Sequence, residues 1–515
     1  MNTPGVYIAG MNSFPNSVVE VETAVPAFIG YTQKSDHNGQ SLAGKAWRVC
    51  SLQEFETYFG GAPAPVFEIV TPLPAAPAEP SPVPDAPTFT VGTTTYALTQ
   101  PSGIYLLYRS MVMFFKNGGA ACYVVSVGKY GDPIAEGDGA ATPGLMTGIT
   151  ALQKEEEPTM VVVPDAVLLK SSECYHLQQQ ALMHCGECGS RVCVLDVWGG
   201  FRDINAPAPA GNCIEGFRNG IGAHSLSFGA AYYPWINTVA VAAADLNYTA
   251  IANPDVLKTA LIAAIDPALT QAQKTHIMDV IHAIPAAGTQ PNPAKFTTDT
   301  LNAALLVQSP AFRNIMTLIQ TRLNLLPPSA AIAGLYAMVD TTYGVWKAPA
   351  NVAVEGALSP AVNITANEQD DLNVPTDGKS VNAIRTFIGR GTLVWCARTL
   401  DGNSLDWRYI SVRRTAIMLE QSVKLAVKAY EFETNDSATW VTIKSMIRNF
   451  LTGVWQRGGL AGAAPDDAFQ VSCGLGETMT AQDILDGILR VTMSVAISRP
   501  AEFIEITFQQ QMQKS

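Results

Sequence analysis

Charged residues are scarce in this chain of 515 residues. They make up 15% of the sequence, whereas hydrophobic residues make up 48%. A surface with so little charge is typical of a protein that becomes buried among copies of itself or other partners. A single hydrophobic core is not expected at this length, so the sequence predicts two or more domains.

The chain also lacks an excess of positive charge. Its formal net charge is −12 at pH 7, and it has no basic run of the kind that nucleic-acid-binding proteins carry, so we expect no nucleic acid partner. The acidic excess is uneven, because residues 380–515 hold 14 Lys and Arg against 13 Asp and Glu. A near-neutral tail behind an acidic body favours electrostatic contact between neighbouring copies.

Long apolar runs are missing as well. No run of about 18 apolar residues is present, so we expect no direct membrane insertion. The first residues lack the basic and apolar segments of a secretory signal. Nine cysteines, an odd number, in such a chain indicate reduced thiols in the cytosol. We therefore expect assembly in the cytoplasm, and any extracellular form to be part of a released particle.

The motifs of common enzymes are absent. We find no Gly-x-Ser-x-Gly, His-Glu-x-x-His or Gly-x-Gly-x-x-Gly. The stretch 39–46 nearly matches a P-loop, but Ala46 stands where a hydroxyl group would bind magnesium. This stretch is therefore predicted to be a plain loop without a nucleotide.

A second possible site combines histidine and cysteine. His184, Cys185, Cys188 and Cys193 are the residue types of a zinc site, but Cys193 falls within an apolar run that predicts a strand. Buried free thiols are the favoured interpretation. The sequence thus predicts no enzyme, no cofactor and no metal, and an α/β enzyme with an unrecognised site is the main alternative.

The middle of the chain alternates between helical and strand patterns. Strand, helix and strand at this spacing predict an α/β fold with a mainly parallel sheet. The proline-rich stretch 62–103 is predicted to be an extended surface insertion. The expected helices cover 52–59, 105–116 and 172–185, and the expected strands 121–127, 160–165 and 191–197.

The last third of the chain has the clearest helices. Apolar residues recur at helical spacing over 412–430 and over 440–454. Thr480 and Asp483 have the spacing of a capping box, which predicts a third, short helix.

Both ends of the sequence have the pattern of short strands. Near the start, Val6 and Ile8 share one face; near the end, Ile504, Ile506 and Phe508 alternate with polar residues. Neither segment has an obvious hairpin partner nearby. Unpaired strands of this kind tend to pair with strands of another chain.

Several longer motifs resemble those of contractile phage tail sheath proteins, and more closely those of extracellular contractile injection systems. The most specific is the stretch 327–337, Pro-Pro-Ser-Ala-Ala-Ile-Ala-Gly-Leu-Tyr-Ala. Where that family often has glycine, this chain has Cys396. The other matching stretches are 3–8, 23–30, 231–235, 344–351, 389–399 and 407–414.

The resemblance implies a structural and mechanical protein. Many copies would form a helical sheath around an inner tube protein, together with baseplate and terminal cap proteins, and contraction would drive the tube through a target envelope. Arg413 and Arg414 are candidates for facing the tube, with a solvated helix face or internal salt bridges as alternatives. A tube or baseplate protein of the same machine is disfavoured by the chain length and by the stretch 327–351.

The resemblance also implies a domain plan. Residues 1–22 would be an N-terminal arm of an inner wall domain, 23–351 an inserted outer α/β domain, and 352–515 the rest of the wall domain, ending in a C-terminal arm. The arms would pair with strands of neighbouring subunits. The residues expected in the arms are Pro4, Val6, Tyr7, Ile8, Phe503, Ile504, Ile506 and Phe508.

Overall fold

The computed structural model describes residues 17–73, 80–139, 142–207 and 211–503. The chain divides into two compact units. The C-terminal unit comprises, of the described residues, 17–23, 339–348 and 409–503. The sheet unit comprises the described residues of 24–338 and 349–408. Residues 352–408, which we predicted to belong to the wall domain, thus pack with the sheet unit. The wall and outer domains are defined by the assembled particle, so that division stays a prediction.

A nine-stranded mixed sheet is the centre of the described part of the sheet unit. Its order is β14-β17-β16-β11-β10-β9-β1-β8-β4. The neighbours from β16 to β8 are parallel, which confirms the predicted mainly parallel sheet, and the edge strands are antiparallel. The strands are β1 Pro26–Thr32, β4 Ala46–Val49, β8 Cys122–Lys129, β9 Met160–Val162, β10 Val192–Asp196, β11 Gly229–Tyr233, β14 Val352–Ala353, β16 Asn382–Phe387 and β17 Gly391–Val394.

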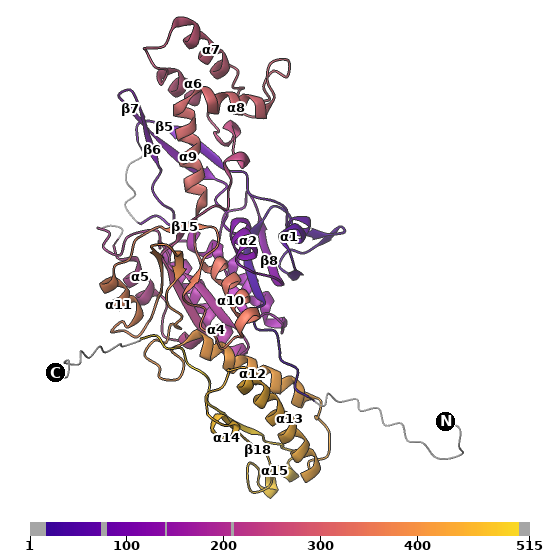
Figure 1. Ribbon diagram of the computed structural model, residues 1–515. Helices are drawn as coiled ribbons and strands as arrows, with labels where there is room; N and C mark the ends of the chain where they lie inside the picture. The colour runs from indigo at the N-terminus through magenta and orange to yellow at the C-terminus, as the bar shows by residue number, and fades with distance from the viewer. Residues whose placement is uncertain (1–16, 74–79, 140–141, 208–210, 504–515) are drawn as a thin grey trace, which may run out of the picture. The chain divides into compact units, whose positions relative to one another are not determined.

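Helices pack against the strands of this sheet (Figure 1). The predicted helices 52–59, 105–116 and 172–185 are confirmed as α1, α2 and α4. The helices around the sheet are α1 Leu52–Phe59, α2 Leu107–Lys116, α3 Leu145–Ala151, α4 Ser171–Cys188, α5 Cys213–Gly220, α10 Ser329–Tyr343 and α11 Ala366–Asn373.

Two buried aspartates near the ends of strands β9 and β10 accept hydrogen bonds from the backbone of other segments. Asp165, just beyond β9, accepts hydrogen bonds from the backbone N–H groups of Tyr31 at 2.9 Å and Leu106 at 2.7 Å. Asp196, at the end of β10, accepts one from Ser329 N at 2.8 Å and so caps α10. Gly30 is required beside Asp165, since a Cβ atom there would come within 2.5 Å of the carboxylate.

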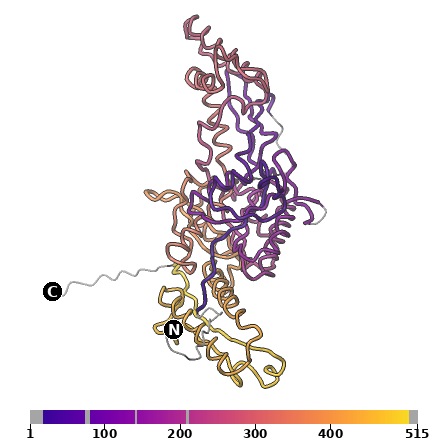
Figure 2. Tube along the Cα trace, turned by 90° about the vertical axis from the view of Figure 1, so that its right-hand side faces the viewer, coloured from indigo at the N-terminus to yellow at the C-terminus, as the bar shows by residue number. Residues whose placement is uncertain are grey.

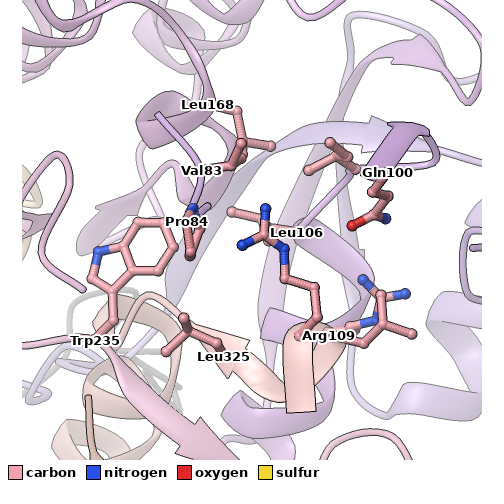
Figure 3. A pocket seen from close by; sticks show the side chains of 11 residues that line it. Val83, Pro84, Gln100, Leu106, Arg109, Leu168, Trp235 and Leu325 are labelled. Atoms are coloured by element: carbon pink, nitrogen blue, oxygen red, sulfur yellow. The ribbon is translucent and has the colours of Figure 1, made fainter. Parts of the chain in front are cut away.

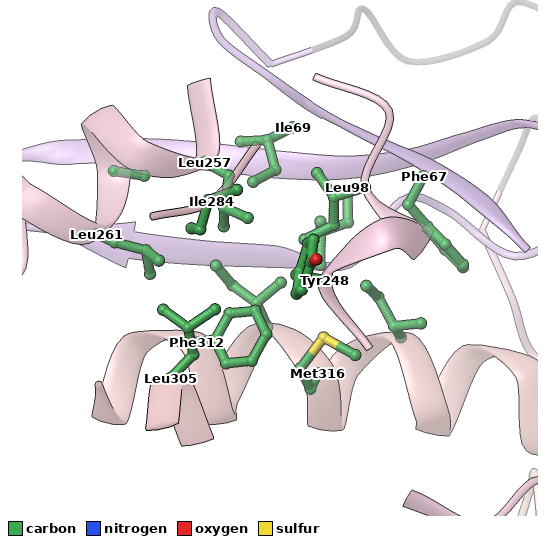
Figure 4. Packing of buried hydrophobic residues seen from close by; sticks show 14 of the residues in the cluster. Phe67, Ile69, Leu98, Tyr248, Leu257, Leu261, Ile284, Leu305, Phe312 and Met316 are labelled. Carbon is green, nitrogen blue, oxygen red and sulfur yellow. The ribbon is translucent and has the colours of Figure 1, made fainter. Parts of the chain in front are cut away.

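The proline-rich stretch 62–103 is not the extended surface insertion that we predicted. Its described residues 66–70, 88–91 and 94–102 form a three-stranded antiparallel sheet, and apolar residues of this sheet are buried against α6 to α9. Figure 4 shows Phe312 and Met316 of α9 pointing toward Ile69 and Leu98 of the strands. The elements are β5 Val66–Val70, β6 Thr88–Val91, β7 Thr94–Ser102, α6 Pro254–Ala263, α7 Gln271–His282, α8 Thr298–Gln308 and α9 Pro310–Asn324.

Two smaller antiparallel sheets complete the described part of the sheet unit. One has the order β13-β12-β15, and the other is the hairpin β2-β3. Their bounds are β12 Ile236–Thr238, β13 Leu325–Leu326, β15 Ala357–Pro360, β2 Asp36–His37 and β3 Gln40–Ser41.

The C-terminal unit is a pair of helices packed on a two-stranded sheet. Its core holds Met418, Leu419 and Val423 of α12, together with Ile443 and Ile447 of α13. Both predicted helices are confirmed, as is the predicted capping box, in which Thr480 Oγ1 accepts from Asp483 N. The elements are α12 Ile410–Lys428, α13 Ser437–Gln456, α14 Pro465–Ala468, β18 Phe469–Ser472, α15 Ala481–Leu485 and β19 Thr492–Val495.

Candidate assembly interface of the C-terminal unit

A buried ion pair fixes the beginning of α12. Arg414 is 4% exposed and donates to both carboxylate oxygens of Asp340, at 3.0 and 2.5 Å. Its guanidinium also donates to the carbonyl oxygen of Thr23 at 3.0 Å, and Thr23 Oγ1 donates to Asp340 at 2.5 Å. Three segments far apart in the sequence are therefore held together by charge-assisted hydrogen bonds.

The described start of the chain is attached to the C-terminal unit at further points. Val21 N donates to Ser422 Oγ of α12 at 3.0 Å, and Glu20 pairs with Arg457 at 2.5 Å. The Arg457 guanidinium lies over the Trp346 ring at 5.1 Å. Figure 2 shows this indigo segment running beside the orange and yellow helices. Residues 20–23 thus fix the described start of the chain to the C-terminal unit, and we call them the anchor.

The described end of the chain is attached to the same unit. Ala461 N donates to Ala496 O at 2.7 Å, and Ser498 N donates to Gly459 O at 3.1 Å. Farther along, the Tyr409 hydroxyl donates to Glu502 Oε2 at 3.1 Å. Both described ends of the chain are therefore tied to one helical unit.

The hairpin of β18 and β19 presents two strand edges. Within the described residues, each strand pairs only with the other. Ala496 N donates to Ala468 O at 2.8 Å, and hydrogen-bonded pairs alternate in an antiparallel ladder. The N–H of Ser494 consequently faces β18, whereas that of Met493 faces the outer edge. A two-stranded sheet is marginally stable alone, and its open edges are suited to receive further strands.

Comparisons with known proteins agree with this architecture. Residues 403–511 match the phage tail sheath C-terminal domain family. The tail sheath protein of Vibrio phage KVP40 is 28% identical over 138 residues, which are 26% of this chain and 20% of that protein. The match thus spans about a fifth of the length of this curated relative.

Two solved sheaths match over nearly the whole chain. The sheath complex of the extracellular contractile injection system PVC, in its contracted state, is 25% identical with a TM-score of 0.58, covering 99% of this chain and 98% of that one. The contracted helical sheath of the anti-feeding prophage AFP is likewise 25% identical with a TM-score of 0.58, covering 99% and 100%. The resemblance to contractile tail sheath proteins is confirmed. The α/β multi-domain architecture expected for such a sheath protein is confirmed as well.

The residues predicted for the arms of this sheath-like protein fall almost wholly outside the described ranges. Pro4, Val6, Tyr7 and Ile8 lie before residue 17, and Ile504, Ile506 and Phe508 lie beyond residue 503. Phe503 is described: it is 75% exposed and belongs to no strand.

Of the two candidate tube-facing arginines, Arg414 is buried in its own subunit. Its bond to Asp340 corresponds to the internal salt bridge that we considered as the alternative. Arg413 is half-buried. Burial raises the pKa of Glu420, two turns farther along the same helix, and the charge of Arg413 partly offsets this rise. Arg413 alone keeps the accessibility that a partner-facing side chain needs.

Exposed apolar side chains on the C-terminal unit were missed in the sequence. Leu425 of α12 is 51% exposed, and Val441 of α13 is 63% exposed. Phe432, between the two helices, is fully exposed and has a φ of 70°. The sequence could have indicated the exposure of Leu425 and Val441, because both residues lie off the apolar stripes of their helices.

The stretches that resembled enzyme sites have structural explanations. The P-loop-like stretch contains β3 and leads into β4, not into the helix that a phosphate site requires. Cys185 and Cys193 are buried with their sulfur atoms 3.3 Å apart. Among the residues that the structure describes, no group of three or more His, Cys, Asp and Glu is placed to hold a metal ion. None of the described helices has both the length and the apolar character needed to cross a membrane.

Proposed function

We propose that this protein is the mechanical sheath subunit of a contractile, phage-tail-like injection system and has no enzymatic role. Many copies polymerise around an inner tube and contract to drive it through a target envelope. The observation that carries the proposal is the attachment of both described chain ends to one helical unit. Segments that continue beyond such anchors can join neighbouring copies without loosening the subunit.

The open hairpin supplies a receptor for these segments. The arm residues before 17 and after 503 have strand periodicity, and β18 and β19 offer their outer edges. Strand addition gives each joint several main-chain hydrogen bonds, each contributing about 0.5–1.5 kcal/mol. Copies joined in this way stay linked while their compact units turn.

Contraction requires two packings of the same subunit. A free-energy change of about 5.5 kcal/mol in favour of the contracted packing shifts an independent subunit from a 1:99 to a 99:1 ratio of contracted to extended states. In a lattice of linked copies the exposed residues Leu425, Phe432 and Val441 are candidate contacts between copies, and Arg413 is another candidate. The free energy is stored during assembly, so the subunit needs no nucleotide.

The domain roles and partners follow from the same proposal. The wall would consist of residues 1–22 and 352–515, with 23–351 forming the outer domain. The partners are an inner tube protein, a baseplate and terminal caps; the PVC and AFP proteins form sheaths. Assembly takes place in the cytoplasm, and the finished particle can act outside the cell.

Electron microscopy of the purified full-length protein tests the proposal. Negative-stain images of the protein expressed alone, at rising concentration, are expected to show hollow striated tubes. The Met493→Pro variant, which lacks an outer-edge donor, is expected to form shorter tubes or none. Compact single subunits at every concentration, in a protein that is folded by circular dichroism, would contradict the proposal.

A further inference from the structure

A small cavity lies in the sheet unit, where β7, α2 and α9 come together. Its volume is about 30 Å³, enough for a group of a few heavy atoms. Figure 3 shows Trp235 and Leu325 on one side of it and Arg109 and Gln100 on the other. The lining residues are Val83, Pro84, Gln100, Ile104, Leu106, Arg109, Leu168, Trp235, Arg322, Leu323 and Leu325.

Arg109 brings a buried positive charge to this cavity. The residue is on α2 and is 4% exposed. Its Nε is buried without an acceptor, and no hydrogen bond or ion pair joins its guanidinium to any of the described residues. Burial lowers the pKa of Arg109 to about 10, with Tyr130 partly offsetting the effect. The side chain is therefore a cation that the described fold leaves uncompensated.

Arg322 brings a second positive charge from the last turn of α9. It is half-buried, and burial lowers its pKa to about 10. Exposed Asp85 offsets this effect, but no ion pair within 4.0 Å is formed with it or with another of the residues in the described ranges. Two guanidinium groups thus line one cavity, and none of the described residues that line it carries a carboxylate.

This arrangement is costly unless a negative charge completes it. Buried charges in proteins are normally paired, because an unpaired one loses its hydration without compensation. An unsatisfied buried donor calls for an explanation such as a bound ion. The apolar walls formed by Leu106, Leu168 and Trp235 strengthen any charge interaction inside the cavity. Guanidinium groups are suited to bind carboxylate or phosphate oxygens in pairs.

We propose that this cavity is a binding site for a small oxyanion, held by Arg109 and Arg322. The anion joins α2, α9 and the segment around Val83, so its binding stabilises the packing of these three segments on one another. Free inorganic phosphate and a small carboxylate such as acetate share the required chemistry. The site is independent of strand exchange and of the sheath function.

Calorimetric titration and thermal unfolding of the purified full-length chain test the site. Phosphate and acetate are titrated separately at constant ionic strength, with chloride as the reference salt. We expect one saturable site per chain for at least one oxyanion, and a rise in Tm that follows its occupancy. The two titrations decide between phosphate and carboxylate as the ligand.

Four variants locate the binding. Arg109→Met and Arg322→Met are each expected to weaken the anion affinity at least tenfold and to abolish the anion-dependent rise in Tm. Arg48→Met is the matched control, because Arg48 is an exposed arginine of the same unit paired with Glu157, and it is expected to bind as the wild type does. Asp85→Asn is expected to tighten binding, because it removes the competing charge near Arg322.

The effect on the anion-free protein separates a binding site from a structural role. If the two arginines wait for a ligand, Arg109→Met leaves the Tm in chloride unchanged or raises it. A fall in that Tm with the anion response preserved would overturn the proposal. So would the absence of saturable binding of either oxyanion to the wild-type chain.

Discussion

At the scale of single residues, the ion pair of Arg414 and Asp340 is the clearest determinant of the C-terminal unit. Both side chains are almost fully buried, at 3% and 6% exposure. Removal of one partner from such a pair leaves a buried charge behind and typically costs about 3–5 kcal/mol. We expect Arg414→Met to lower the free energy of unfolding by about this amount in urea denaturation of dispersed subunits.

The neighbouring arginine is the control for this experiment. Arg413 is half-buried, so Arg413→Gln is expected to change the free energy of unfolding by less than about 1 kcal/mol. If Arg413→Gln impairs tube binding while leaving stability intact, the partner-facing role belongs to that residue. Equal and small losses for both variants would contradict the structural role of Arg414.

The buried carboxyl of Asp196 predicts a pH dependence of stability. Burial raises the pKa of Asp196 to about 7, although the N–H and hydroxyl of Ser329 counteract the rise. This value lies above the unfolded value of about 3.9. The folded state therefore holds the proton more tightly, and the stabilisation that results is complete below about pH 4 and is lost as the pH rises through 7.

The comparison with Asp196→Asn isolates this group. Asp165, whose pKa burial raises to about 6, acts in the same direction in both proteins and cancels in the difference. We expect the free energy of unfolding of the wild type, relative to the variant, to fall between pH 4 and 7. Urea denaturation at a series of pH values measures it, and a difference that is constant over this range would show that Asp196 does not titrate there.

Local signals in the sequence predicted single residues well, and distant partners could not be predicted. Thr480 and Asp483 are three residues apart, so the capping box was evident. Asp340 and Arg414 are 74 residues apart, and no local pattern in the sequence indicates that they form a pair. The pairing of Arg109 and Arg322 in one cavity likewise depends on how α2 and α9 pack.

At the scale of elements, hydrophobic periodicity predicted the long helices and the buried strands. Helices α12 and α13 begin and end close to the predicted stripes, because their buried faces recur at helical spacing. The stretch 62–103 was predicted to be an extended surface insertion because prolines remove backbone donors and block helix formation. Phe67 and Ile69, on either side of Glu68 in β5, and Leu98 of β7 are instead buried in a core. The strand order of the main sheet follows from tertiary packing and was not predictable.

The hairpin of β18 and β19 yields a prediction at this scale. The Met493 N–H faces the outer edge, whereas the Ser494 N–H faces β18. Met493→Pro removes an outer donor without removing a bond of the hairpin. We expect it to shorten or abolish tubes in electron micrographs while the Tm of dispersed subunits stays close to that of Met493→Ala.

Two control variants complete this test. Met493→Ala removes the half-buried side chain but keeps the N–H, so it is expected to assemble. Ser494→Pro breaks the hairpin ladder itself and is expected to lower the Tm as well. Normal tubes from Met493→Pro would exclude this edge as a receptor for arms.

At the scale of the whole molecule, we propose that the residues that stabilise the subunit differ from the residues that link it to neighbouring copies. The described start of the chain is fixed by Val21, Thr23 and Glu20. The segment before residue 17 lies beyond these bonds. The proposed linking function therefore requires that the first residues contribute to assembly and little to the folding of the subunit.

Deletion of residues 1–16 tests this separation. Because the anchor at residues 20–23 is retained, we expect the Tm of the dispersed subunit to stay within about 1 °C of the wild type, a shift worth about 1 kcal/mol for a chain of this length. Tubes should be absent in negative-stain images.

Replacement of residues 1–16 by an equally long Gly and Ser segment keeps the length but removes the apolar positions Val6 and Ile8. This variant should also fail to form tubes. If the Gly and Ser replacement assembles, length alone matters and strand pairing of this segment is wrong; if the deletion lowers the Tm strongly, the segment belongs to the fold of its own subunit.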